Sequence, residues 1–480
     1  MRVQVIVALL AASAAAVNAQ TVETRLGPLA TNNGYPTAAT ADKLYDEMDF
    51  QRATQAYIWA LPAVGFKGLY DAQAKTLGSK NGDVLLYKGL KDKAGMLTPN
   101  LTTVYLFSFW DLAKQGPLVV DVPNGPTAGA ILDIWQQPVI DIGQTGPDKG
   151  KGGKYLILPP GSPDIDAPGY FIARSPSNQI WVGNRGLDQD KVAAEATVRQ
   201  HKIYGWDQRA SPPTTGYAEV AGRDWTSAQP ADLNYWRLLS ELYADEPVAP
   251  RDRVMFGMLK GLGVEPGKPF KPDARQAKIL GDAAVTGDLM ARTIAYDKRY
   301  EGAKLYPGKH WDYAVMFDLD HENPDKTRMQ LDERSSWFYE AVAMSVGMQG
   351  RIVGFGQAYV ETSKDKDGNW LDGGKSYRFR VDPNAPVKQF WSITLYDNLT
   401  RGPLVTSQGA ADLSSRSKGI VTNADGSVDV YFGPEKPAGA TNWIKTTAGK
   451  GWFPYFRFYG PTEAYFDKSW QLNDIEPLAK

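Results

Sequence analysis

The residues best suited to chemistry are carboxylates beside aromatic side chains, near the ends of predicted strands. Asp133 and Trp135 share one face of a strand predicted over 129–136, and Tyr396 and Asp397 close the central strand of a later β region. Two carboxylates can cleave a glycoside, one as the acid and the other as the base or nucleophile. We therefore take Asp133, Asp397 and Tyr396 as candidate catalytic residues of a hydrolase or lyase.

Arginine side chains lie near the ends of other predicted strands. Arg185 and Arg457 end or interrupt apolar strands, and Arg401 follows the central strand. An aromatic ring such as that of Trp135 stacks on the apolar face of a sugar, while guanidinium groups fix hydroxyls or carboxylates. These four residues are candidate ligand contacts. The alternative is that the same charges form buried ion pairs that tie the sheets together, since structural networks give the same pattern.

The central strand of the later β region runs through Phe390–Asn398. Its alternate residues Trp391, Ile393 and Leu395 form a wholly apolar face. The residues between them form a mixed aromatic and polar face: Phe390, Ser392, Thr394 and Tyr396. Such a strand is predicted to cover a core on one side and to line a wetter space on the other.

Two β regions, separated by a helical segment, are predicted to position these residues. Short strands rich in aromatic residues, with Pro, Gly and Ser turns between them, recur in the first and last parts of the chain. Apolar residues at helical spacing dominate the middle, and a further helix is expected from about Phe50, kinked or split at Pro62. The predicted fold class is β-rich α+β, with two β-sandwich or barrel modules and a mainly helical middle segment.

The predicted boundaries divide the chain into five parts. They are a signal peptide over 1–19, a lead-in and N-terminal helix over 20–96, a first β module over 97–187, a helical middle segment over 188–352 and a C-terminal β-sandwich module over 353–480.

Composition argues against several classes of protein. Lys and Arg number 53 and Asp and Glu number 54, so there is no basic excess for binding nucleic acid or an anionic membrane surface. The absence of Cys excludes disulfides and thiol chemistry. Aromatic residues make up 11% of the chain, beside 47 Gly and 32 Pro, which favours a β-rich fold.

Residues 1–19 have the features of a signal peptide. Arg2 precedes an apolar, Ala-rich run over Val5–Val17, and Val17-Asn18-Ala19 is a small-x-small cleavage pattern. The run is too short to span a membrane, and no later stretch is long and apolar enough to do so. We therefore expect export, to the periplasm or outside the cell, with a mature chain that begins at Gln20.

Other chemical signals are weaker. Several potential ligands for Ca²⁺ gather in one loop: Asp318, Asp320, His321, Glu322 and Asp325. Their spacing is not that of an EF-hand, so a solvated acidic loop is the preferred interpretation, no metal ligand is assigned and the cofactor stays unknown. Ser415 and Lys418 fit the Ser-x-x-Lys signature of penicilloyl-type acyl transfer, but this serine precedes a strand instead of opening a helix.

The later β region resembles a known family. The matching stretches are Tyr377-Arg378-Phe379, Phe390–Asp397, Asp425-Gly426-Ser427, Asn442-Trp443 and Phe456–Pro461. They resemble the bacterial domain-of-unknown-function family 1214.

The first β region resembles the usual companion of that family, the domain-of-unknown-function family 1254. The matching stretches are Thr98-Pro99-Asn100, Gly152–Gly161 and Gly169-Tyr170-Phe171. The two-part resemblance implies an exported bacterial protein of β-sandwich or barrel modules with helical insertions, and it implies no settled activity. Asn100, in the first motif, is a fifth candidate ligand contact. More typical members carry an Asp soon after this Asn, where this chain has Leu101-Thr102-Thr103.

Three functional hypotheses follow. The leading one is an exported protein that binds a polar small molecule, such as a glycan, in a cleft between the β modules. The second is a secreted hydrolase or lyase that uses the paired carboxylates with Tyr and Arg assistance. The third is an assembly module, in which exposed aromatic residues make contacts in a homo-oligomer. No nucleic-acid partner and no membrane span are expected.

Overall fold

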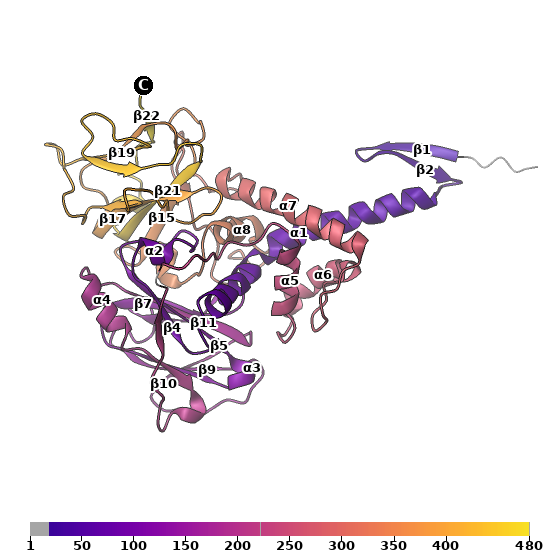
Figure 1. Cartoon of the computed structure of the whole chain (residues 1–480), viewed down its shortest axis with the longest axis horizontal. Helices are drawn as coiled ribbons and strands as arrows, with labels where there is room; N and C mark the ends of the chain where they lie inside the picture. The colour runs from indigo at the N-terminus through magenta and orange to yellow at the C-terminus, as the bar shows by residue number, and fades with distance from the viewer. Residues whose placement is uncertain (1–18, 221, 480) are drawn as a thin grey trace, which may run out of the picture.

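The computed structural model describes residues 19–220 and 222–479. Figure 1 shows two β modules on one side of the molecule and a group of helices beside them. The long helix α1 (Ala38–Asp71) extends out of this group, and a small N-terminal sheet lies at its far end, away from the modules. The strands of that sheet are β1 (Ala19–Thr24), β2 (Gly27–Asn32) and β3 (Tyr35–Pro36). The predicted signal peptide lies outside the described residues, apart from Ala19.

Helix α1 is the axis of the helical part. It begins upstream of the predicted start near Phe50, because the Thr37 hydroxyl caps it by accepting a hydrogen bond from the Thr40 N–H. Pro62 lies inside α1 without ending it. The helices that pack around α1 are α5 (Leu233–Leu242), α6 (Arg253–Leu259), α7 (Ala274–Tyr296) and α8 (Leu331–Glu340). They confirm the predicted helical middle. No helix within the described ranges combines the length and apolar character needed to cross a membrane.

The first β module is a sandwich of two sheets. One has the strand order β13 (Tyr217–Glu219), β4 (Val84–Tyr87), β5 (Val104–Asp111), β11 (Gln179–Gly186), β7 (Thr127–Leu132) and β8 (Pro138–Gly143). The other has the order β10 (Tyr170–Arg174), β9 (Gly153–Leu158), β6 (Leu118–Val122) and β12 (Lys202–Gly205). Their facing side chains share one buried core. The strands β4, β12 and β13 lie outside the span 97–187, so the module draws on the segments to either side.

The C-terminal module is also a sandwich. Its inner sheet has the order β14 (Asp312–Tyr313), β15 (Gln357–Glu361), β21 (Trp452–Pro461), β17 (Val387–Asp397) and β18 (Asp412–Ser414). Its outer sheet has the order β20 (Asn442–Lys445), β19 (Val428–Gly433), β16 (Tyr377–Val381) and β22 (Glu476–Pro477). The predicted apolar face of the central strand, Trp391, Ile393 and Leu395 on β17, packs in the core between these sheets.

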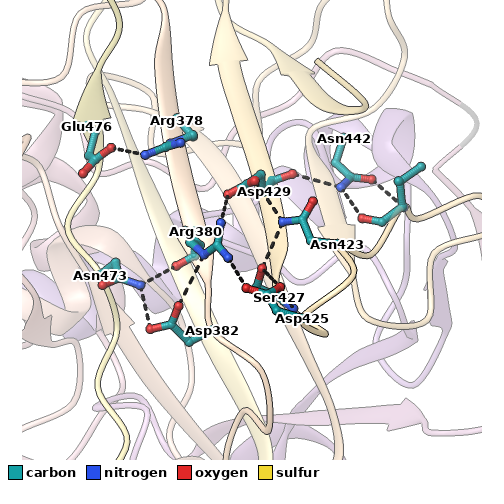
Figure 2. A network of polar contacts seen from close by, with 11 residues as sticks. Arg378, Arg380, Asp382, Asn423, Asp425, Ser427, Asp429, Asn442, Asn473 and Glu476 are labelled. Atoms are coloured by element: carbon teal, nitrogen blue, oxygen red, sulfur yellow. Dashed lines mark hydrogen bonds and ion pairs between the residues drawn. The ribbon is translucent and has the colours of Figure 1, made fainter. Parts of the chain in front are cut away.

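The outer sheet is tied together on its solvent side by a polar network. Figure 2 shows Arg380 of β16 between the carboxylates of Asp382, Asp425 and Asp429. The Arg380 guanidinium lies 3.6 Å from Asp382 and 3.5 Å from Asp429, and it also pairs with Asp425. Arg378 pairs with Glu476 of β22 at 2.7 Å. Each of these surface cations therefore has its own carboxylate partner.

Two glycines of α7 test how closely it packs on α1. A methyl group on Gly287 would come within 2.6 Å of the Tyr57 ring, whereas a methyl group on Gly281 would meet no atom within 4 Å. We expect Gly287→Ala to lower the free energy of unfolding by about 1–3 kcal/mol through overpacking. Gly281→Ala, on the same helix, should raise it by about 0.5–1 kcal/mol through helix propensity. Urea unfolding of both variants checks this, and equal effects of the two substitutions would contradict the close helix contact.

Candidate functional site

A cavity of about 90 Å³, which we call the inner cavity, lies where the two β modules meet. It is bounded by β5, β7 and β11 of the first module, by β15 and β21 of the C-terminal module, and by the segment that follows α8. Its charged lining residues are Arg185 and Arg457, one from each module. No carboxylate is found among the described residues that line it.

Arg457 of β21 is buried, with 2% of its surface exposed. Its guanidinium donates hydrogen bonds to the Thr98 carbonyl at 2.9 Å, to the Tyr396 hydroxyl at 2.8 Å and to the Thr394 hydroxyl at 3.2 Å. The Tyr396 hydroxyl in turn donates to the Pro99 carbonyl at 2.7 Å. All these acceptors are neutral, and Nε has no acceptor within the described parts of the chain. Arg457 is therefore a buried cation without a carboxylate partner there.

Arg185 of β11 is also without a carboxylate partner in the described ranges. Its guanidinium lies 3.3 Å from the side-chain amide of Gln357, which also contacts the Tyr359 hydroxyl at 2.6 Å. Both contacts are neutral, so the positive charge of Arg185 is not compensated by them. Because Arg185 lines both the inner cavity and the larger space outside it, it marks the junction between the two.

The two sheets that meet at the cavity present matching arrangements. Each carries its arginine on an interior strand, with a tyrosine directly opposite on one neighbouring strand and a small residue on the other. The cross-strand neighbours are Tyr105 and Ala128 for Arg185, and Tyr359 and Ser392 for Arg457. Residues opposite one another project to the same face of a sheet. The site is thus built from two similar halves, one on each module.

The segment between α2 (Leu90–Lys93) and β5 forms one wall of the cavity. Asn100 is 2% exposed, and its Oδ1 accepts hydrogen bonds from the N–H and hydroxyl of Thr103 at 3.0 and 2.8 Å, while Nδ2 has no acceptor among the described residues. Thr98 has a positive φ of 35°. Lys93 is fully buried behind this wall and donates to the Asn100 carbonyl at 2.9 Å. Burial lowers the pKa of Lys93 well below its usual value.

A larger space of about 620 Å³, the outer basin, adjoins the inner cavity and shares Ala128 and Arg185 with it. The cations that line it are Arg185, Lys191, Lys388, Arg416 and Lys418, and the acids are Asp188 and Asp412. The rings of Phe390 and Tyr459 stack in its wall with centroids 3.9 Å apart. Cations outnumber acids, so the basin favours anions near its surface.

Asp133 and Trp135 lie elsewhere, in the loop after β7. The buried Asp133 carboxylate accepts hydrogen bonds from the N–H groups of Trp135 and Gln137 at 2.8 and 2.9 Å. Burial raises its pKa to about 7. Both residues line a separate cavity beside Arg251, and the Trp135 ring packs on Trp59 with centroids 5.0 Å apart.

Asp397 and Arg401 lie at the far end of β17. Asp397 pairs with Lys450 at 2.9 Å and accepts hydrogen bonds from the N–H groups of Leu399 and Thr400. Burial opposes ionisation, but these hydrogen bonds and Lys450 outweigh it, so the pKa of Asp397 lies below its usual value. Asp397 lines a third cavity. The buried Arg401 guanidinium lies 4.3 Å from the centre of the Tyr339 ring.

The structure thus brings together Asn100, Arg185 and Arg457, with Tyr396 in contact with Arg457. It places Asp133 and Asp397 against different cavities. Tyr105 and Tyr359 also line the inner cavity but were missed by sequence reasoning. Their alternation with apolar residues on β5 and β15 was the available signal, and it is equally typical of a core strand.

The acidic loop over 318–325 is engaged by basic or polar side chains. Asp318 pairs with Arg351, Asp320 pairs with Lys326, and Asp325 accepts a hydrogen bond from the Thr327 hydroxyl at 2.6 Å. In the described ranges, no group of three His, Asp or Glu side chains is arranged to hold a metal ion.

Both β modules match family models. Residues 356–463 match the protein family of unknown function DUF1214, and residues 86–205 match the family of unknown function DUF1254. The two matches lie in the predicted order. The stretch that matches DUF1254 contains Asn100 and Arg185, and the stretch that matches DUF1214 contains Arg457, so the inner cavity lies within neither stretch alone.

One solved structure resembles this chain in fold at low sequence identity. The VPA0106 protein from Vibrio parahaemolyticus is 17% identical with a TM-score of 0.54, over 90% of this chain and 100% of that one. An uncharacterized protein from Burkholderia cenocepacia is 11% identical with a TM-score of 0.40, over 92% of this chain and 96% of that one. No curated protein matches the chain.

The raised pKa of Asp133 predicts a pH effect on stability. A carboxyl whose pKa is about 7 in the folded protein and near 3.9 in the unfolded chain favours folding most when protonated. Its contribution should therefore fall as pH rises from about 4 to about 7, by up to about 4 kcal/mol. Asp133→Asn removes this titration. We therefore expect the free energy of unfolding of the natural protein to fall relative to that of the variant as pH rises over this range. Urea unfolding of both proteins at several pH values measures this, and parallel pH profiles would contradict the assignment.

Proposed function

We propose that this protein is exported and binds a small molecule with a negatively charged group in the cavity between its two β modules. The observation that carries the proposal is the pair Arg185 and Arg457, which reach one cavity from different modules without a carboxylate partner among the described residues.

The energetic argument starts from the cost of burying a charge. A buried cation without an opposite charge costs several kcal/mol, part of which a bound anion would return. The same chain pairs another buried cation fully: Lys298, with 0% of its side chain exposed, lies between the carboxylates of Glu340 and Glu361. Arg457, which is 2% exposed, and the partly buried Arg185 have no such partner among the described residues, and both line the same cavity, so an anionic ligand would complement the two together.

Two other ligands or activities fit less well. A glycan would need the outer basin, since a space of about 90 Å³ is small for a sugar ring, and the Phe390 and Tyr459 rings in the basin wall are largely covered, at 7% and 2% exposed. A hydrolase or lyase with paired carboxylates would need acids at the reacting bond, and the described lining of the inner cavity contains none.

Thermal unfolding of residues 20–480 against small carboxylates, inorganic phosphate, glycans and Ca²⁺ tests the proposal. A ligand at a hundred times its dissociation constant stabilises the protein by about 2.7 kcal/mol. We expect that stabilisation with anions. If no member of the panel raises the unfolding temperature, the binding proposal fails.

Arg185→Gln is the matching variant. Losing one charged hydrogen bond costs about 1.5–3 kcal/mol, or roughly 10- to 150-fold in affinity for the anion. Without ligand, the variant should unfold at the same temperature as the natural protein or higher, because a poorly compensated charge has been removed. Arg378→Gln, which breaks a surface pair on the outer sheet, is the control and should keep full affinity. Equal affinity of Arg185→Gln and the control would exclude this cavity as the site.

A further inference from the structure

The inner cavity also carries information about which kind of anion it would hold. Two of its buried polar atoms, Nε of Arg457 and Nδ2 of Asn100, have no hydrogen-bond partner in the described chain. Both atoms are donors. A complementary ligand must therefore present acceptor atoms at this place, as a carboxylate or phosphate does and as a cation cannot.

Most of the remaining lining is apolar. Its buried members include Met96, Leu97, Phe107, Leu132, Val342 and Met344. Such a surface gains free energy from an apolar group and loses it when a polar group is buried without partners. The unbranched Met side chains can adapt to different apolar shapes.

Size limits that apolar group. A dry apolar cavity of about 150 Å³ is known to hold benzene, whereas this one measures about 90 Å³. It has room for a branched alkyl group of a few carbons. Any further part of the ligand would extend past Arg185 into the outer basin of about 620 Å³.

We infer, on the basis of the proposed function, that the ligand is a small amphiphilic acid. Its oxyanion is held between Arg185 and Arg457 beside Asn100, and a compact apolar group occupies the inner cavity. The basic outer basin, with Lys191, Lys388, Arg416 and Lys418 in its wall, attracts the anion toward the junction.

Titration calorimetry with matched probes tests the inference. The probes are 3-methylbutanoate, acetate, inorganic phosphate and the neutral 3-methylbutan-1-ol. We expect 3-methylbutanoate to bind at least about tenfold more tightly than acetate, because only the former fills the apolar cavity. It should also bind at least about tenfold more tightly than the alcohol, because only an oxyanion pairs with the arginines.

A cavity-filling variant gives an independent readout. Ala130 of β7 is 3% exposed and lines the inner cavity. Ala130→Val should reduce the preference for 3-methylbutanoate over acetate severalfold while acetate binding persists. Ala173→Val, the same substitution on strand β10 away from the cavity, should leave the preference unchanged. Thermal unfolding of both variants without ligand shows whether each is folded.

The outcomes separate the two proposals. If acetate or phosphate binds as tightly as 3-methylbutanoate, the apolar half of the inference is overturned and anion binding stands. If the alcohol binds as tightly as the acid, the oxyanion half is overturned. If none of these probes binds but the wider panel yields a ligand, the inference of an amphiphilic acid is wrong while the protein still binds a ligand. If nothing binds at all, both the inference and the proposed function are wrong.

Discussion

The contact on which the architecture depends is made by the Arg457 guanidinium. It reaches from the inner sheet of the C-terminal module to the Thr98 carbonyl, and through the Tyr396 hydroxyl to the Pro99 carbonyl. These bonds hold the wall segment of the first module against the inner sheet. A guanidinium has five donors in a fixed fork, which is why one residue can serve several acceptors on two modules. Placing that charge at the interface leaves the cavity beside it positive.

The sequence allowed the broad architecture to be predicted because each element carries its own periodic pattern. The central strand predicted through Phe390–Asn398 is found as β17, and its alternate apolar residues pack in the core. The start of α1 was placed too late, because its exposed first turns show no apolar stripe and only the Thr37 cap marks them. The first β module reaches beyond its predicted span through β4, β12 and β13, since pairing of short strands depends on distant partners.

The site was only partly predictable, because it also depends on contacts between residues that are far apart in the sequence. Arg185 and Arg457 stand out in the sequence because arginines at the ends of apolar strands or within them are unusual, and Asn100 stands out through the family motif. All three line one cavity. Asp133 and Asp397 stand out equally, yet their oxygens accept hydrogen bonds from nearby backbone N–H groups. A carboxylate that closes a local turn and one that faces a ligand look alike until the chain is folded. Residues 100, 185 and 457 come together through the pairing register of the strands and the contact between the two modules. Neither can be predicted from the spacing of residues within a short stretch.

The matching arginines have a consequence for cooperativity. Each belongs to a different domain, and the segment after α8 that completes the cavity belongs to neither family match. A molecule held by both arginines becomes part of the joint between the domains, so its binding free energy is shared by the folding of both. Occupancy would then couple the unfolding of the two domains. Unfolding of either domain would release the ligand, and with it the stability that binding gives to the other domain.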